Sequence, residues 1–194
     1  MMKVKYLTKV TDLNKVLLED VINEGDIVID ATMGNGYDTK YLAEKVGENG
    51  FVYSFDVQEE AIKSTKKRLE KAGLIDRVNL ILDGHQNMDM YVNKEVSCIM
   101  FNLGYLPRAK HQVITKPETT LEAIKKSLEL LKPNGVVSIA IYTGHEGGME
   151  EYDEVFGYVS KLDQSEYSVL NCNFVNQINH PPRLIMIEKK NNYI

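Results

Sequence analysis

Short apolar runs alternate with amphipathic segments along most of the chain. The runs have the length of strands, and the segments between them place apolar residues at helical spacing. The runs cover residues 27–29, 51–55, 78–82, 96–101 and 136–142, and the helical segments cover 10–22, 39–46, 59–71, 117–131 and 148–162. Strands that alternate with helices favour right-handed crossovers and a mostly parallel sheet with both faces covered.

The last part of the chain breaks this alternation. Residues 167–176 and 183–189 alternate intermittently, as strands do, and no helical segment separates them. We therefore expect them to pair as an antiparallel hairpin at one edge of the sheet. With no repeat or linker, residues 1–194 are predicted to form one Rossmann-like α/β domain with about seven strands, in which residues 1–23 are a flanking helical segment.

Composition narrows the class of protein but leaves the partner open. The formal net charge of −5 argues against broad nucleic-acid binding, although a local basic patch stays compatible with it. No apolar run approaches the roughly 20 residues that span a bilayer, and no signal peptide is evident, so a cytoplasmic protein is expected. Cys98 and Cys172 lack metal-ligand spacing, and no metal site is predicted.

A glycine-containing turn follows the first apolar run. Asp30 stands at the tip of the predicted strand, and Gly34 and Gly36 permit backbone conformations that a Cβ would forbid. They also let a ligand lie close to the main chain. The strand, the turn and the following helix together predict a loop that binds a nucleoside-containing cofactor.

Polar residues also end the next three strands, as Asp56, Asp83 and Asn102. Asp56 lies 20 residues past Gly36, the distance at which an acidic side chain meets ribose hydroxyls in dinucleotide folds. Each residue alone fits a helix cap or a turn. Four polar strand tips, Asp30 included, instead indicate one ligand-binding edge.

The turn lacks the third glycine of dinucleotide-binding loops, which disfavours a nicotinamide oxidoreductase. It resembles the first motif of class I S-adenosylmethionine methyltransferases, with Thr32 in place of the first glycine. In such a site, Asp83 can contact the adenine amino group. The predicted donor-binding residues are Asp30, Thr32, Gly34, Asn35, Gly36, Asp38, Thr39, Asp56, Gln58, Asp83, Gly84, His85 and Asn102.

Residues 102–105 resemble the Asn/Asp-Pro-Pro-Tyr/Phe motif of amino-group methyltransferases, with Leu-Gly in place of the prolines. That resemblance implies that Asn102 accepts a hydrogen bond from the target nitrogen and that Tyr105 stacks on the substrate. In-line positioning supplies most of the acceleration. Asn102 and Tyr105 are therefore the predicted catalytic residues. The candidates for a general base, which the chemistry does not require, are Asp38, His85 and His145.

Four segments together resemble the YtqB-type (MnmM) family of methyltransferases: residues 30–39, 101–107, 115–120 and 179–182. The resemblance implies transfer of a methyl group from S-adenosylmethionine to 5-aminomethyl-(2-thio)uridine at the wobble position of tRNA, giving the methylaminomethyl nucleoside. It also implies a homodimer. After Pro107, the chain departs from the more Gly-rich turn expected of the family and has Arg-Ala-Lys.

RNA binding requires aromatic surfaces for a splayed base and cations for phosphates. Tyr105 and Tyr142 lie at predicted strand ends, where a base of the tRNA anticodon stem-loop could stack. The predicted substrate-binding residues are Tyr105, Arg108, Lys110, His111, Tyr142, His145 and Arg183, with Lys116 in the same basic patch. Taken singly, each basic residue is as readily a solvated surface residue.

Two alternatives stay open from the sequence. One keeps the reaction but changes the target to ribosomal RNA or a small-molecule amine. The other is a non-catalytic module that binds S-adenosylmethionine and RNA. Methyl transfer to tRNA that bears the aminomethyl group distinguishes the predicted enzyme from both.

Overall fold

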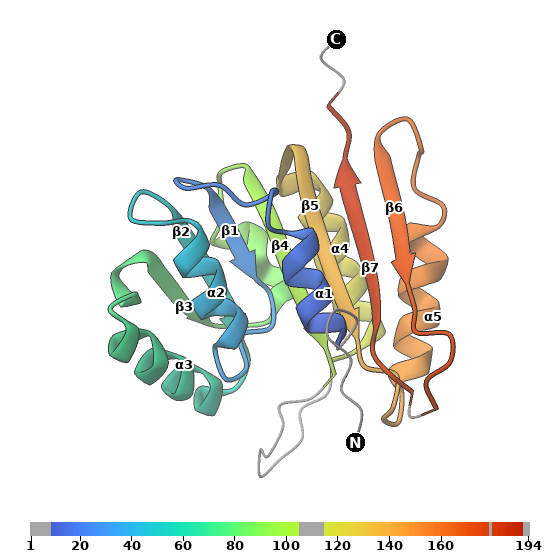
Figure 1. Ribbon diagram of the computed structural model, residues 1–194, viewed down its shortest axis with the longest axis horizontal. Helices are drawn as coiled ribbons and strands as arrows, with labels where there is room; N and C mark the ends of the chain where they lie inside the picture. Colours follow the sequence, from blue (N-terminus) through green and yellow to red (C-terminus); the bar gives the residue numbers. More distant parts are fainter. Residues whose placement is uncertain (1–8, 105–114, 179, 192–194) are drawn as a thin grey trace.

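The computed structural model describes residues 9–104, 115–178 and 180–191 (Figure 1). The roles predicted for Tyr105, Arg108, Lys110 and His111 concern residues outside these ranges. The helices are α1 Val10–Leu17, α2 Tyr37–Lys45, α3 Glu59–Ala72, α4 Pro117–Leu130 and α5 Gly148–Val159, with short 3-10 helices η1 Ile75–Arg77 and η2 His85–Met90. The strands are β1 Ile27–Asp30, β2 Phe51–Asp56, β3 Val78–Leu82, β4 Val96–Leu103, β5 Leu131–Ile141, β6 Tyr167–Cys172 and β7 Arg183–Lys189.

The strands form one seven-stranded sheet in the order β3-β2-β1-β4-β5-β7-β6. Strands β1 to β5 pair in parallel, and β7 is antiparallel to both β5 and β6. The predicted Rossmann-like sheet and its antiparallel pair at one edge are therefore confirmed. The strand order reverses at β1, because β2 and β3 lie on one side of it and β4 and β5 on the other. Open α/β sheets bind ligands at such a switch point.

Helices cover both faces of the sheet, as the near-continuous apolar runs require. On one face, Leu42 of α2 and Leu69 of α3 pack in a core with Val28 of β1, and α1 lies over the same face. On the other face, Ile124 of α4 and Val155 of α5 pack with the sheet. Figure 1 shows α1 and α2 in front of the sheet and α4 behind it.

The three largest differences from the predicted element boundaries are in α1, β5 and β6. Helix α1 ends at Leu17, whereas the prediction extended it to residue 22. Leu18 and Ile22 are buried in the turns that follow, so their apolar spacing looks like a continuation of the helix. Strand β5 begins at Leu131, which pairs with Val96 before the register shifts, and Asn134 has a φ of 61° in that irregular stretch. Strand β6 ends at Cys172 instead of residue 176.

The connection between β3 and β4 holds η2, whose Met88 enters the core. A separate feature concerns membranes. Within residues 9–104, 115–178 and 180–191, no helix combines the length and the apolar character needed to cross one.

Candidate active site

A cleft of about 770 Å³ opens at the carboxyl ends of β1, β2, β3 and β4. It brings together most of the predicted site residues from distant parts of the chain. Those that line it are Thr32, Gly34, Asn35, Asp38, Asp56, Gln58, Asp83, Gly84, His85, Asn102 and Tyr142. Three other predicted donor-site residues, Asp30, Gly36 and Thr39, are buried behind this lining.

Asp30 supports the cofactor loop from below. Its carboxylate is fully buried and accepts hydrogen bonds from the Thr39 hydroxyl at 2.6 Å and the Thr32 amide at 3.1 Å. Thr39 also shares a hydrogen bond with Ser54 at 2.9 Å. Burial, and after it the charge of Asp38, raises the pKa of Asp30 to about 7, although both hydrogen bonds oppose the rise.

This raised pKa makes the stability of the ligand-free protein depend on pH. The folded state holds the Asp30 proton up to a pKa of about 7, against an ordinary value of 3.8, so this contribution is complete below pH 3.8 and is lost as the pH rises through 7. We expect Asp30→Asn to gain up to roughly 4 kcal/mol relative to the wild type between these limits.

Urea unfolding of both proteins at several pH values between 4 and 8 measures this difference. Asp76→Asn, at an exposed site in η1, is the control and should leave the pH profile unchanged. Parallel profiles for the wild type and Asp30→Asn would contradict the burial of a titrating carboxyl group.

Helix α3 holds the glycine-containing turn in place. Gly36 has a φ of 74°, and a Cβ there would lie 2.6 Å from the Thr65 hydroxyl oxygen. The same Thr65 hydroxyl donates to the Gly34 carbonyl at 3.1 Å, and Arg68 donates to the Asn35 carbonyl at 2.7 Å. A side chain at position 36 would therefore need both a left-handed backbone and a displaced α3.

Asp56 joins the turn to the second strand. Its carboxylate accepts hydrogen bonds from the amides of Gly34 and Gln58, both at 2.9 Å. Burial raises its pKa, against the opposing effect of these hydrogen bonds. A carboxylate offers about four lone-pair positions, so Asp56 retains capacity for hydroxyl donors of a ligand in the cleft.

Asp83 and His85 form the floor beyond β3. Asp83 accepts hydrogen bonds from Asn87, Tyr91 and the Gly84 amide, and the Asn87 bond is the main cause of its lowered pKa. The His85 ring nitrogen Nδ1 lies 3.2 Å from the Ala31 carbonyl, to which it must donate. Burial lowers the pKa of His85, so the ring is neutral at pH 7 and supports the loop.

Asn102 is held by two contacts at the end of β4. Its backbone amide donates to the Thr32 hydroxyl at 2.7 Å, and its side-chain amide donates to Asp38 at 2.8 Å. Lys15 forms an ion pair with the other oxygen of Asp38 at 2.9 Å. Because a carboxylate only accepts, Asp38 fixes the amide orientation and leaves the Asn102 carbonyl oxygen as an acceptor for a ligand.

The remaining predicted substrate residues lie at different distances from this centre. Tyr142 lines the cleft, and burial, with a smaller effect of Asp38, raises the pKa of its hydroxyl. A Cβ on Gly104 would lie 3.6 Å from the His145 ring, yet His145 is not part of the cleft lining. Arg183 stacks over the Tyr152 ring of α5 at 4.1 Å, also outside that lining.

Sequence reasoning missed the contribution of the N-terminal segment to the site. Lys9, Thr11 and Lys15 line the cleft beside the strand tips. Their position depends on how α1 lies on the sheet, where buried Asn14 accepts a hydrogen bond from Ser138 at 2.6 Å. No local motif marks these residues. Lys116, predicted as part of a basic patch, does line the cleft.

The sheet order, with β7 reversed beside β5, and the cleft at the strand tips define the fold of class I methyltransferases. Residues 52–188 match the family model described as "Putative rRNA methylase". A chloroplastic tRNA (mnm5s2U34)-methyltransferase of Arabidopsis thaliana is 39% identical over 193 residues, which cover 94% of this chain and 70% of that protein.

Two solved structures are similar over nearly the whole chain. One is described as a "putative rRNA-methylase" from Clostridium thermocellum. It has 45% sequence identity and a TM-score of 0.92, and the match covers 97% of this chain and 100% of that chain. The other is described as a "putative methyltransferase" from Streptococcus mutans in complex with SAH. It has 43% sequence identity and a TM-score of 0.85, and the match covers 97% of this chain and 99% of that chain. The chain therefore belongs to this methyltransferase family, and the predicted resemblance to YtqB-type (MnmM) proteins is confirmed.

Proposed function

We propose that this protein is an S-adenosylmethionine-dependent tRNA methyltransferase. It transfers a methyl group to the amino nitrogen of 5-aminomethyl-(2-thio)uridine at wobble position 34, which forms 5-methylaminomethyl-(2-thio)uridine. The observation that carries this proposal is the fixed orientation of Asn102, whose side-chain amide donates to Asp38. The side-chain carbonyl oxygen of Asn102 is left to accept a hydrogen bond from the N–H group of an amine. The Arabidopsis relative is named for the same wobble nucleoside.

The cleft fits S-adenosylmethionine in size and in donor set. Asp56 would accept the ribose hydroxyls, Asp83 would face the adenine amino group, and the turn at Gly34 would lie against the methionine part. The exposed Val57 side chain next to Asp56 offers an apolar surface for the adenine ring. When bound, the cofactor supplies a methyl group on a positively charged sulfur, which is a good leaving group.

The residues at the end of β4 would prepare the amine. An alkylammonium has a pKa near 10, so the neutral nucleophile is scarce at pH 7. Asn102 would accept a hydrogen bond from one N–H group of the amine and so direct the nitrogen lone pair at the methyl carbon. In the transfer, the N–C bond would form as the S–C bond breaks. The neutral amine forms when the ammonium group of the substrate releases one proton to solvent, and the methylated product is a secondary ammonium group that keeps its charge at pH 7.

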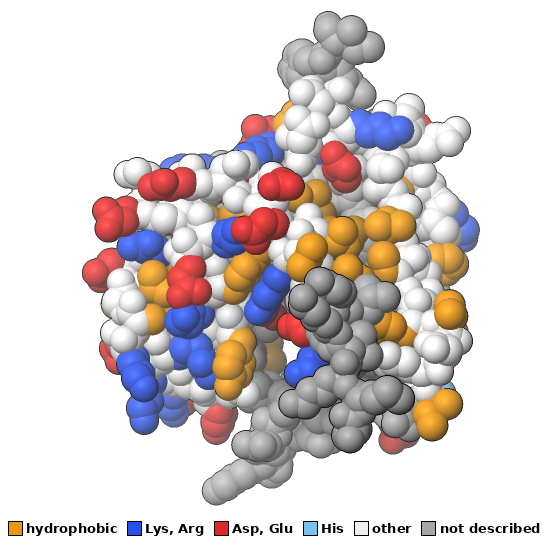
Figure 2. Space-filling model, in the orientation of Figure 1, with side chains coloured by type: hydrophobic (Ala, Val, Ile, Leu, Met, Phe, Trp, Pro, Cys, Tyr) orange, Lys and Arg blue, Asp and Glu red, His pale blue; other side chains and the backbone are white. Residues whose placement is uncertain are grey.

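We also propose the wider setting of this activity. Residues 1–194 form one methyltransferase domain. The protein binds the tRNA anticodon stem-loop in the cytoplasm as a homodimer. Lys9, Lys15 and Lys116 supply cations at the cleft in an otherwise acidic protein. Figure 2, in the same view as Figure 1, shows hydrophobic side chains gathered over β7 and β6 and charged ones over α2 and α3. The hydrophobic area supports a protein contact near β6.

An assay with defined tRNA tests the proposed reaction. We expect methyl transfer from S-adenosylmethionine to tRNA that bears the 5-aminomethyl group and none to the same tRNA without it, because only the former carries a nucleophilic amine. Mass spectrometry of the digested nucleosides identifies the product. Transfer to ribosomal RNA fragments or to free amines, with the modified tRNA left unmethylated, would contradict the proposal in favour of the alternative targets.

A further inference from the structure

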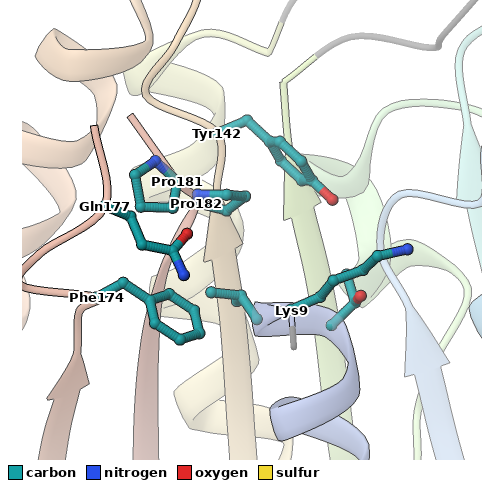
Figure 3. Close-up of a pocket in the computed structure, with 8 residues that line it drawn as sticks. Lys9, Tyr142, Phe174, Gln177, Pro181 and Pro182 are labelled. Carbon is teal, nitrogen blue, oxygen red and sulfur yellow. The ribbon is translucent and has the colours of Figure 1, made fainter. Parts of the chain in front are cut away.

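A second cavity of about 320 Å³ adjoins the donor cleft (Figure 3). It lies where the start of α1, the residue after β5 and the connection from β6 to β7 meet. Lys9, Thr11 and Tyr142 line both this cavity, here called the side pocket, and the cleft. The side pocket and the cleft are therefore neighbours that share these three residues as a boundary.

Tyr142 also ties the side pocket to Asn102. The Tyr142 backbone amide donates to the carbonyl of Leu103 at 3.0 Å, and Leu103 directly follows Asn102 on β4. The Tyr142 side chain thus stands at the boundary between the side pocket and the strand tip at which we place the amine. A group attached to a ring in the side pocket can extend past Tyr142 toward Asn102.

The walls of the side pocket suit a flat, polar-edged ring. Tyr142 and Phe174 supply aromatic surfaces, and Pro181 and Pro182 supply a rigid wall beside them. Figure 3 shows the Gln177 amide group between Pro181 and Phe174, with Lys9 on the opposite side of the cavity. An amide both donates and accepts, so Gln177 can pair with the N3–H and a neighbouring oxygen of a uracil.

We propose that the side pocket binds the pyrimidine ring of the target uridine once it leaves the anticodon loop. Enzymes that modify a base extrude it into a pocket with stacking walls and hydrogen bonds to its pairing edge. The aminomethyl arm then points past Tyr142 to Asn102, and Lys9 faces the phosphate side of the nucleotide. This inference rests on the proposed function, because it requires a uridine substrate.

Photocrosslinking locates the ring directly. An anticodon stem-loop with 5-iodouridine at the wobble position is irradiated with the full-length wild-type protein, and the crosslinked peptide is mapped by mass spectrometry. We expect crosslinks to Tyr142 or Phe174. A matched stem-loop with the probe at the adjacent 3′ nucleotide should give none there. Crosslinks to the side pocket from the adjacent nucleotide alone, or from neither position, would overturn the assignment.

Kinetics give a second, independent readout. Gln177→Ala removes the edge contact, and we expect the KM for the aminomethylated stem-loop to rise about tenfold, with kcat and the affinity for S-adenosylmethionine within twofold of the wild type. The control is Asn176→Ala, an exposed amide on the same connection and outside the side pocket, which should match the wild type. An unchanged KM in Gln177→Ala would overturn the assignment.

The two proposals fail in different ways. If the wild-type protein methylates no tRNA that carries the aminomethyl group, the proposed function fails. If the wild type is active but the crosslinks fall outside the side pocket, or the KM of Gln177→Ala is unchanged, only the pocket assignment fails. Tyr142→Ala, which removes the stacking surface, should raise the KM more than Tyr142→Phe, which keeps it.

Discussion

Asn102→Ala is expected to lower kcat for the aminomethylated tRNA by at least about 100-fold, with little change in the affinity for S-adenosylmethionine. The variant loses the acceptor that orients the amine, and misplacement of a nucleophile alone costs about this factor. Because the Asn102 side chain meets Asp38 and not the glycine-containing turn, the donor site should keep its shape.

Single-turnover rates at saturating donor separate chemistry from binding in this test. The control is Asn79→Ala, an exposed asparagine on β3 away from the cleft, which should retain the wild-type rate. A rate for Asn102→Ala within threefold of the wild type would show that the amine is positioned by other groups. Loss of donor binding would instead assign Asn102 to the cofactor.

Asp56→Ala is the second substitution with a large expected effect, and it acts on donor affinity. Hydrogen bonds to a charged group contribute about 1.5–3 kcal/mol each, and a ribose diol would form two with this carboxylate. The variant also releases the amides of Gly34 and Gln58, which Asp56 now holds. We expect the Kd for S-adenosylhomocysteine to rise by about 100-fold or more.

Isothermal titration calorimetry measures this change directly. Asp56→Asn should weaken binding less than the alanine variant, because its oxygen can still accept one of the bonds. Asp76→Ala, at an exposed acid in η1, should bind like the wild type. A Kd for Asp56→Ala within threefold of the wild type would remove the ribose role.

The sequence predicted the sheet because each strand is a short apolar run with turn residues at both ends. It misplaced the start of β5, where Lys132 and Pro133 look like a helix stop although Leu131 already pairs with Val96. That pairing is a contact between strands far apart in the chain. No local pattern encodes it.

The candidate site was predictable to the extent that it consists of strand tips. Asp56, Asp83 and Asn102 do meet in one cleft. The ion pair between Lys15 and Asp38 was not predictable, because it forms only when α1 lies on the sheet. The sequence also could not show that Asp30 is buried behind the turn, since an acid at a strand tip looks the same whether it faces solvent or the core.

The place of β7 in the sheet has a consequence for synthesis of the protein on the ribosome. Strand β7 comes after β6 in the chain but lies between β5 and β6. Until residues 183–189 emerge, a nascent chain has β5 with an unpaired edge and β6 with no neighbour in the sheet. Unpaired strand edges favour aggregation, so we expect a nascent chain that stops before residue 183 to aggregate more readily than the complete sheet.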